Sequence, residues 1–472
     1  MTTPLHLNPD RLLPAEAGVR SVARRLYQHV QGLPIISPHG HTDPAWFATN
    51  APFADATQLL LHPDHYLLRM LYSQGLALEA LGLARRPGEA QPGADLRAAW
   101  RLFGAHYHLF RGTPSRLWLD YVFAQIFGLR VRLSADTADE YYDRINAQLA
   151  TAPFRPRALF ERFNIEVLAT TESPTDPLVH HRALRSSGWG GRVITAFRPD
   201  PVVDPQYEGF RDGLAQLGAL TGEDTGRYRG YLAALRQRRA YFASLGATAT
   251  DHGHPTAATA DLGEGEAAAL FGRVTGDDFT PQEAELFRAH MLTVMAGMSL
   301  EDGLVMQLHP GSFRNHNQPL FERFGRDRGA DIPYAIDYVR ALRPLLNRYG
   351  NEPRLTLILF TLDESTYARE LAPLAGHYPA LRLGPAWWFH DSPEGMRRYR
   401  AQVTETAGFY NTVGFNDDTR AFLSIPARHD VARRIDSGVL AQLVVEHQLE
   451  EAEAAQLAVE LAHGLVKRAY RL

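Results

Sequence analysis

The chain has 472 residues, of which 22% are charged, and a formal net charge of −4, so it is long enough for one enlarged domain or two domains. This ordinary charge balance, without any Lys/Arg-rich run, argues against nucleic acid as a partner. Because the sequence contains no cysteine, disulfides and thiolate metal sites are excluded, and a bound metal would need His, Asp or Glu as ligands.

The N-terminal residues 1–14 show no basic region followed by an apolar stretch, which a secretory signal peptide would need. Nowhere does an uninterrupted apolar run reach the roughly 18 residues of a membrane-spanning helix. We therefore expect a cytoplasmic protein without a membrane partner.

Eight short apolar runs rich in β-branched residues recur along the chain and predict β-strands. They span residues 33–37, 166–170, 192–197, 245–250, 304–308, 355–360, 381–384 and 410–415. Nearly all of them stop abruptly at a polar cluster. Polar residues at the C-terminal ends of eight strands are the layout of a (β/α)8 TIM barrel, because its active site is built from the βα loops. A doubly wound sheet is the alternative.

The stretch between residues 37 and 166 is far longer than a βα crossover needs. Helix-like apolar spacing predicts a large helical insertion after the first strand, packed over the barrel mouth, where it could shield the site from water. The expected division is 1–54 for the N-terminal segment and first strand, 55–155 for the helical insertion, 156–427 for the remainder of the barrel, and 428–472 for C-terminal helices that close the barrel.

One candidate metal site combines the two ends of the strand series. His39 and His41 follow the first run, and side chains two positions apart on a strand point to the same side, where they could share a cation. From the residues alone, ligand and structural roles are equally open. Asp417 and Asp418 follow the eighth run, which lies beside the first in a closed barrel, and could supply a carboxylate. Capping of the next helix is the alternative for either Asp.

Two further His-x-His pairs occur in the sequence. His106 and His108 fall in a helix-like run, where a separation of two positions turns the side chains apart, so they cannot share a metal. His252 and His254 follow the fourth run, and a hydrogen-bonding role is favoured for them.

The series of motifs along the chain resembles the uronate (glucuronate) isomerase family, a branch of the amidohydrolase-like metal barrels. The matching segments are SPHGHTDP at 37–44, DHYLLR at 64–69, RGTP at 111–114, FNIEVLATT at 163–171, FRPD at 197–200, TDHG at 250–253, VMQLH at 305–309 with Arg314-Asn315, AWWF at 386–389 and DTR at 418–420. Nine motifs in the family's order would not arise by chance. One departure is Gly40 between the two histidines, where many members carry Cys.

The resemblance implies a role for each matching residue. The implied metal ligands are His39, His41 and Asp418. The implied catalytic residues are Asp418 as the base at C2, directly or through a substrate hydroxyl, Tyr66 as proton shuttle and His65 in ring opening. The implied substrate-binding residues are Arg198, Arg420, His309, Asp251, Arg314 and Trp387. For His309 a role as a further metal ligand is the alternative, and for Trp387 core packing is an equally good alternative.

The implied reaction is the aldose–ketose isomerisation of D-glucuronate to D-fructuronate, and of D-galacturonate to D-tagaturonate, through an enediol in hexuronate catabolism. The implied cofactor is one divalent metal ion. Zinc is the first choice, with manganese or another divalent ion as the alternative, and no nucleotide or flavin is expected. The expected partner is a small-molecule hexuronate, and a homo-oligomer is allowed. A metal-dependent hydrolase or deaminase of the amidohydrolase superfamily is the alternative, since the same ligands can activate water. A non-catalytic sugar-acid binding protein would more naturally have lost a ligand.

Overall fold

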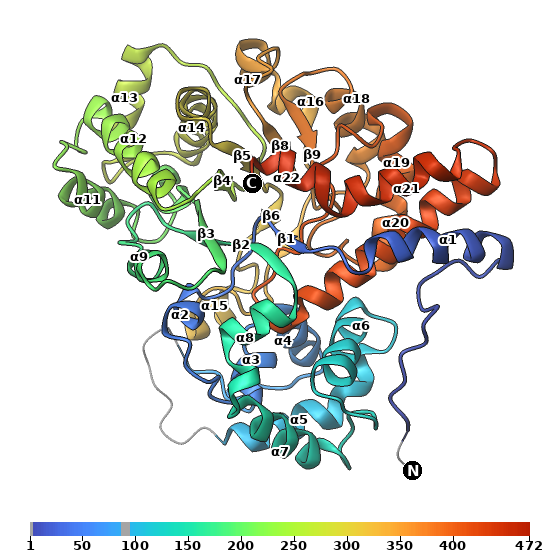
Figure 1. The fold of residues 1–472 in the computed structure, drawn as a ribbon. Coiled ribbons are helices and arrows are strands. Elements are labelled where there is room, and N and C mark those ends of the chain that lie inside the picture. Colours follow the sequence, from blue (N-terminus) through green and yellow to red (C-terminus); the bar gives the residue numbers. More distant parts are fainter. Residues whose placement is uncertain (1–2, 86–94) are drawn as a thin grey trace.

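The centre of the computed structural model, which describes residues 3–85 and 95–472, is a curled seven-stranded sheet (Figure 1). Its strands are β1 Ile35–Ser37, β2 Ile165–Glu172, β3 Arg192–Phe197, β4 Ala249–His252, β5 Val305–Leu308, β8 Leu357–Leu359 and β9 Leu381–Leu383. They pair in this order and all in parallel. Parallel neighbours in chain order, each joined by helices, form the (β/α)8 barrel that the sequence predicts.

The eighth position of the barrel lacks a regular strand, so the prediction of a strand over 410–415 is wrong. A single parallel bridge joins Thr412 to Leu383 of β9. The extended path ends at Gly414, whose φ of +76° lies in the left-handed region that glycine adopts without strain. The ring is completed beyond this point, where the backbone N–H of His41 donates to the carbonyl of Thr419 at 3.0 Å.

The fourth strand is shifted relative to the prediction of residues 245–250. Leu245 still caps the preceding helix, and Gly246 turns the chain at a φ of +101°. The strand therefore begins at Ala249 and carries Asp251 and His252 within it rather than after it.

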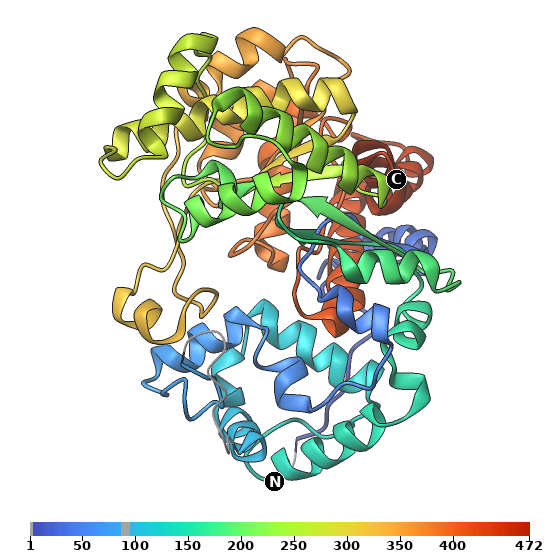
Figure 2. The ribbon, with the colours of Figure 1, turned by 90° about the vertical axis from the view of Figure 1, so that its left-hand side faces the viewer.

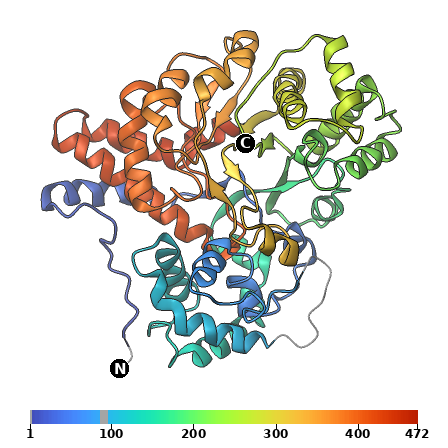
Figure 3. The same ribbon diagram turned by 180° about the vertical axis from the view of Figure 1, so that it is seen from behind.

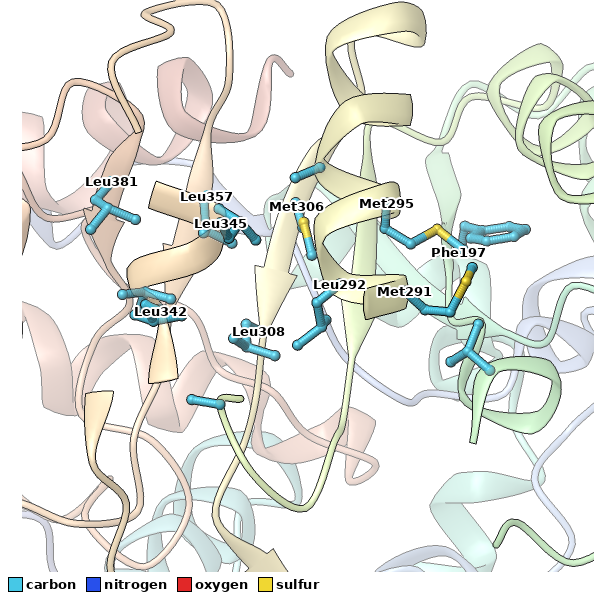
Figure 4. Close-up of a cluster of buried hydrophobic side chains, with 14 of the residues drawn as sticks. Phe197, Met291, Leu292, Met295, Met306, Leu308, Leu342, Leu345, Leu357 and Leu381 are labelled. Carbon is cyan, nitrogen blue, oxygen red and sulfur yellow. The ribbon is translucent and has the colours of Figure 1, made fainter. Parts of the chain in front are cut away.

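Alternate strand residues face the barrel interior, as the period of two in a strand requires. The interior cluster contains Ile36, Val167, Ala169, Ile194, Ala249, Val305 and Ile358. The residues between them pack outward, for example Met306 and Leu308 of β5 against Met291 and Leu292 of helix α14 (Figure 4). Burial on both faces explains why these strands read as continuous apolar runs.

The barrel is covered by helices on its outer side. They are α9 Val179–Ser186, α10 Asp200–Val203, α11 Phe210–Thr221, α12 Tyr228–Ser244, α13 Glu264–Val274, α14 Pro281–Asp302, α16 Tyr338–Ala341, α17 Arg343–Tyr349, η4 Tyr367–Leu371, α18 Ala372–Ala375, α19 Pro393–Ala407 and η5 Phe422–Ser424. The longest one, α14, has a local reason for its bounds. Thr280 and Glu283 form a capping box at its start, and Gly303 ends it in the left-handed conformation.

The last helices are α20 Ile425–Val445, α21 Glu451–Val459, η6 Glu460–Gly464 and α22 Leu465–Tyr470, and α1 Ala17–Val30 packs on α20 and α21 (Figure 1). Helix α20 packs on the outer side of the barrel, whereas α22 lies at the end opposite the polar clusters. Closure of the barrel by residues 428–472 remains our proposal. Val466 and Tyr470 belong to the interior cluster, and the Tyr470 hydroxyl donates to Gln307 Oε1 at 3.0 Å. Arg471 contacts the backbone of Gly303 and Arg354, which precede β5 and β8.

Between β1 and β2 the chain builds a helical layer with its own apolar cluster, which includes Trp100, Phe103 and Phe123. Its elements are α2 Pro44–Thr49, α3 Ala56–Leu60, α4 His65–Ser73, α5 Leu96–His106, η1 Tyr107–Phe110, α6 Pro114–Tyr121, η2 Val122–Ile126, α7 Ala138–Leu149, η3 Ala152–Phe154 and α8 Pro156–Arg162. Figure 2 shows this layer facing one end of the barrel. The division at 55–155 remains our proposal, and residues 86–94 of it lie outside the described residues.

A second excursion from the barrel reaches the same layer. After β5, strand β6 Ser312–Phe313 pairs antiparallel with β7 Ile332–Pro333, and helix α15 Gln318–Phe324 lies between them. Leu320 and Phe324 of α15 pack into the apolar cluster of the helical layer, and Figure 3 shows α15 beside α4. We call α4 and residues 310–337 together the roof. Within residues 3–85 and 95–472, every helix is too short or too polar to span a bilayer.

Candidate active site

A cavity of about 970 Å3 lies between the C-terminal ends of the strands and the roof. The structure brings all of the expected site residues together there. Those that line the cavity are His39, His41, His65, Tyr66, Arg198, His309, Arg314, Trp387, Asp418 and Arg420. Asp251, the remaining one, is fully buried beneath them and contacts His309.

The tightest group of ligand atoms consists of His39, His309 and Asp418, whose donor atoms lie within 4.8 Å of one another. His39 Nε2 is 3.6 Å from Asp418 Oδ1, and the rings of His39 and His309 stack at 4.9 Å. His41, expected in this group, approaches from one side with its Nε2 3.3 Å from Asp418 Oδ1. Both His309 and His41 therefore lie close enough to Asp418 to be considered as ligands beside His39.

The donor atoms of this group fit a divalent cation. Within the described part of the chain, neither Asp418 Oδ1 nor His309 Nε2 has a hydrogen-bond partner, although both atoms are buried. Buried polar atoms without a partner are costly, and a cation would satisfy both of them. Imidazole nitrogens with one carboxylate oxygen are the ligands that zinc and similar ions accept in proteins.

The electrostatics of the group favour ligand protonation states. Burial lowers the pKa of His39 to about 4, so its ring is neutral at pH 7 and keeps a free lone pair. For Asp418, burial alone would raise the pKa, but the neighbouring His39 and His41 hold it well below the usual value. Asp418 is therefore ionised, which is the form that binds a cation.

A buried network behind the group fixes the orientation of His309. Asp251 of β4 accepts a hydrogen bond from His309 Nδ1 at 2.7 Å. It also forms an ion pair with Arg198, whose Nη1 lies 3.0 Å from Asp251 Oδ2. Because Nδ1 carries the proton, Nε2 of His309 is left as the acceptor that faces Asp418. Arg198 also donates from Nε to Asp200 Oδ2 at 2.7 Å, so its charge is shared by two carboxylates.

The roof contributes His65 and Tyr66 from the first turn of α4. The carboxylate of Asp64 caps this helix by accepting from the backbone N–H of Tyr66 at 2.9 Å. The Tyr66 hydroxyl donates to Asp391 at 3.0 Å, and Arg428 donates to the same carboxylate at 2.8 Å. Burial, followed by the charge of the neighbouring Arg420, lowers the pKa of His65 to about 3, so this ring is neutral as well.

Trp387 and two arginines complete the walls of the cavity. Trp387 Nε1 donates to Asp418 Oδ2 at 2.6 Å, so this side chain both packs against the core and orients the carboxylate. Arg420 pairs with Asp327 of the roof at 3.1 Å. Arg314 pairs with Asp331 at 2.8 Å. Among the described residues, each of these arginines forms a salt bridge with one carboxylate, whereas Arg198 forms salt bridges with two.

The remaining His-x-His pairs lie outside the proposed metal-ligand group. His106 ends α5 and His108 lies in η1, and their rings bond to the carbonyls of Leu102 and Ala105, both in α5. His252 of β4 points away from the barrel interior, where its Nε2 lies 3.1 Å from Thr250 Oγ1. His254 lines the cavity.

The structure corrects the expectation for Asp417, which was a helix cap or a surface contact. This residue is 3% exposed and accepts from His429 Nε2 at 2.9 Å and from Ser37 Oγ at 3.2 Å. Neither Asp417 nor Asp418 caps a helix, since α20 has Ser424 at its N-cap. Asp418 lines the cavity, whereas Asp417 bonds to His429 of α20 outside the barrel.

Several residues of the site were not predicted from the sequence, and only some of them carry a signal that could have revealed them. Asp327 of the roof and Arg428 of α20 reach the site from segments far from the predicted strand ends. Asp200, Glu172 and Asp391 lie in or beside the polar clusters after strands, and that position was the available signal. Burial raises the pKa of Glu172 to about 8, and Thr195 donates to its carboxylate.

A barrel with His and Asp ligands gathered at the C-terminal ends of its strands defines the class of metal-binding barrel enzymes. The model of the glucuronate isomerase family matches residues 17–468. A uronate isomerase of Rhizorhabdus wittichii is 72% identical over 99% of this chain and 99% of its own length. Another, from Sphingopyxis alaskensis, is 71% identical over 100% of both chains. The chain belongs to the glucuronate isomerase family.

The structural comparison agrees with this assignment. The crystal structure of glucuronate isomerase from Caulobacter crescentus has a TM-score of 0.98 and 62% identity, and the match covers 99% of this chain and 98% of that one. The resemblance inferred from the nine motifs is thereby confirmed. The chain is an isomerase that acts on a small-molecule uronate, and the hydrolase or deaminase alternative finds no support in these relatives.

Proposed function

We propose that the chain interconverts D-glucuronate with D-fructuronate, and D-galacturonate with D-tagaturonate, with Asp418 as the base at C2. The observation that carries this proposal is the environment of the Asp418 carboxylate. Trp387 fixes Oδ2, while Oδ1 faces His39 and His41 in the cavity. An ionised carboxylate that faces the cavity can act as a general base when the substrate proton lies within its reach.

The proposed metal site uses His39, His41 and Asp418, with His309 as a further ligand. Zinc is proposed because three imidazoles and one carboxylate match its preferences, and manganese is the alternative. When bound, the ion would orient the substrate and stabilise negative charge on its oxygens.

The proton transfers can be assigned to side chains of this chain. Asp418, or a substrate hydroxyl that it activates, removes the proton from C2, which gives the enediol, and the proton is returned at C1. The Tyr66 hydroxyl moves the second proton from the C2 oxygen to the C1 oxygen, with Asp391 as its hydrogen-bond partner. The neutral ring of His65 can accept or donate a proton, which suits opening of the sugar ring.

Arg420 and Arg314 are proposed to bind the uronate carboxylate, and they are better candidates for this contact than Arg198. Arg198 already forms ion pairs with Asp200 and Asp251, which leaves little of its charge for a substrate. Arg420 is 37% exposed and pairs only with Asp327 among the salt bridges of the described residues. A planar guanidinium can bind a carboxylate through two hydrogen bonds.

The site of the reaction is proposed to be the cytoplasm. A homo-oligomer remains a prediction that light scattering of the purified protein can test.

Proton NMR of the metal-replete protein with each uronate should show the two ketose products. Hydrolysis of an amide or a nucleobase, without isomerisation of either uronate, would overturn the proposal.

A further inference from the structure

A buried pair of side chains, Asp417 and His429, lies directly behind the Asp418 carboxylate. His429 of α20 donates from Nε2 to Asp417 Oδ2 at 2.9 Å. Both residues are at most 3% exposed, and neither lines the active-site cavity. The ring of His429 also packs edge-on against Phe415 at 4.9 Å. The pair therefore has no access to substrate and can act only through its neighbours.

The pair is attached to two of the three segments that carry proposed metal ligands. Asp417 is the residue before Asp418, and its other carboxylate oxygen accepts from the hydroxyl of Ser37 at 3.2 Å. Ser37 ends β1, two residues before His39. One carboxylate thus joins the first strand, the turn at the eighth position and helix α20.

The turn that carries Asp418 has one backbone bond to the segment after β1, from the His41 N–H to the Thr419 carbonyl, and Asp417 adds a side-chain anchor to β1. Asp418 has a φ of +33°, which a residue with a side chain adopts only when its surroundings impose it. This part of the ring also lacks a regular strand, since a single bridge at Thr412 is its connection to β9. Asn416 holds the backbone N–H of Asp418 at 3.0 Å, but that bond is local to the turn and does not tie it to the barrel.

We infer that Asp417 and His429 are a positioning pair that holds the Asp418 carboxylate at the proposed metal site. His429 fixes the direction of the Asp417 carboxylate, and Asp417 in turn fixes the distance between the Asp418 turn and β1. Partners behind a metal ligand commonly change metal affinity by 10–100-fold when they are lost. This inference rests on the metal site proposed above.

The test compares His429→Leu, which removes the donor, with His429→Gln, whose amide N–H can replace Nε2–H. The purified proteins are titrated with Zn²⁺ in competition with a chromophoric chelator, and the Co²⁺-loaded forms are compared by visible absorption. We expect His429→Leu to bind Zn²⁺ at least tenfold more weakly, with a changed Co²⁺ spectrum and a lower kcat at similar KM. His429→Gln should restore most of the affinity and the spectrum.

A matched control separates positioning from packing. His290→Leu removes another buried imidazole, whose Nε2 bonds to the Tyr228 hydroxyl at 2.8 Å on the outer side of the barrel. It should lower Tm like His429→Leu but leave Zn²⁺ affinity unchanged. Equal Zn²⁺ affinity and an unchanged Co²⁺ spectrum in His429→Leu would overturn the inference.

Two further results are decisive. If His429→Leu does not fold, Asp417→Asn takes its place, and wild-type metal affinity in that variant also overturns the inference. If the wild-type protein itself binds neither ion, the proposed metal site fails instead, so the two failures are distinguishable.

Discussion

The cavity has two unlike halves, one built by the barrel strands and one built by the roof. On the strand side, Asp251 and His309 are at most 3% exposed and are joined by a hydrogen bond within the barrel. On the roof side, Asp327 is 39% exposed and pairs with Arg420, which follows the eighth barrel position and is 37% exposed. Strands are fixed by their neighbours, so the strand side suits chemistry that needs exact geometry. The roof side adds the proposed proton-transfer residues His65 and Tyr66, and it suits recognition and exclusion of water.

The largest effect that this comparison predicts lies on the strand side. Asp418→Asn keeps the shape of the side chain but removes its charge and basicity, so kcat and exchange of the substrate C2 proton with solvent should both fall about 100-fold or more. Asp417→Asn should be much milder. Metal analysis of both proteins belongs to the test, because full recovery of Asp418→Asn by added metal would limit this residue to metal retention.

The two halves should also respond differently to loss of an arginine. Arg198→Met leaves Asp251 and Asp200 buried without their cation, so Tm and kcat/KM should both fall, the latter by about 10–100-fold. Arg420→Met should raise KM for both uronates by about tenfold or more with little change in Tm. Steady-state kinetics and thermal melts of the two variants check this contrast, and an unchanged KM in Arg420→Met would remove the proposed carboxylate contact.

A smaller effect is expected for the hydroxyl that the roof contributes. Tyr66→Phe removes the proposed proton shuttle and should lower kcat by about tenfold, since water can replace part of the relay. Tyr107→Phe is the matched control, because its buried hydroxyl donates to Asp120 at 2.9 Å within the helical layer. That variant should lose about 1 kcal/mol of stability without a change in kcat. Equal kcat values for the two variants would count against the shuttle.

The last effect concerns stability rather than rate. Burial raises the pKa of Glu172 to about 8, so folding favours its protonated form. Its contribution to stability is complete below the usual pKa of about 4.5 and is lost as the pH rises toward 8, by at most about 1.4 kcal/mol per pH unit. Denaturant unfolding of the wild type and Glu172→Gln at pH 5, 6.5 and 8 should show a difference that changes in this direction. Parallel curves would contradict it.

The order of the strands and the strand-borne residues could be predicted because both depend on local patterns. Strands buried on both faces are apolar throughout, and the polar residues after them must lie at the same end of a parallel barrel. This reasoning placed His39 and His41 beside the Asp417–Asp418 pair, and the family resemblance selected Asp418 and added His309. It failed at 410–415, because the apolar run there gives no sign that Gly414 leaves the extended conformation.

The roof could not be predicted in the same way. Strands β6 and β7 have two residues each, which is too short for a periodic pattern, and α15 finds its apolar partners in a layer built from residues before β2. The pairing of Asp327 with Arg420 is likewise a contact between distant loops. For Asp417, strand alternation gives the side that it faces but not the presence of His429 behind it.

The packing of α22 at the end of the barrel opposite the cavity has a consequence for biosynthesis. Val466 and Tyr470 complete the interior cluster, and Tyr470 is the hydrogen-bond partner of Gln307 in β5. Helix α1, made first, likewise finds its packing partners in α20 and α21. When the last strand has left the ribosome, the barrel is therefore still incomplete. The Gln307 side chain finds its partner Tyr470 only 163 positions later, and α1 packs only after α20 and α21 have been synthesised, which takes many seconds.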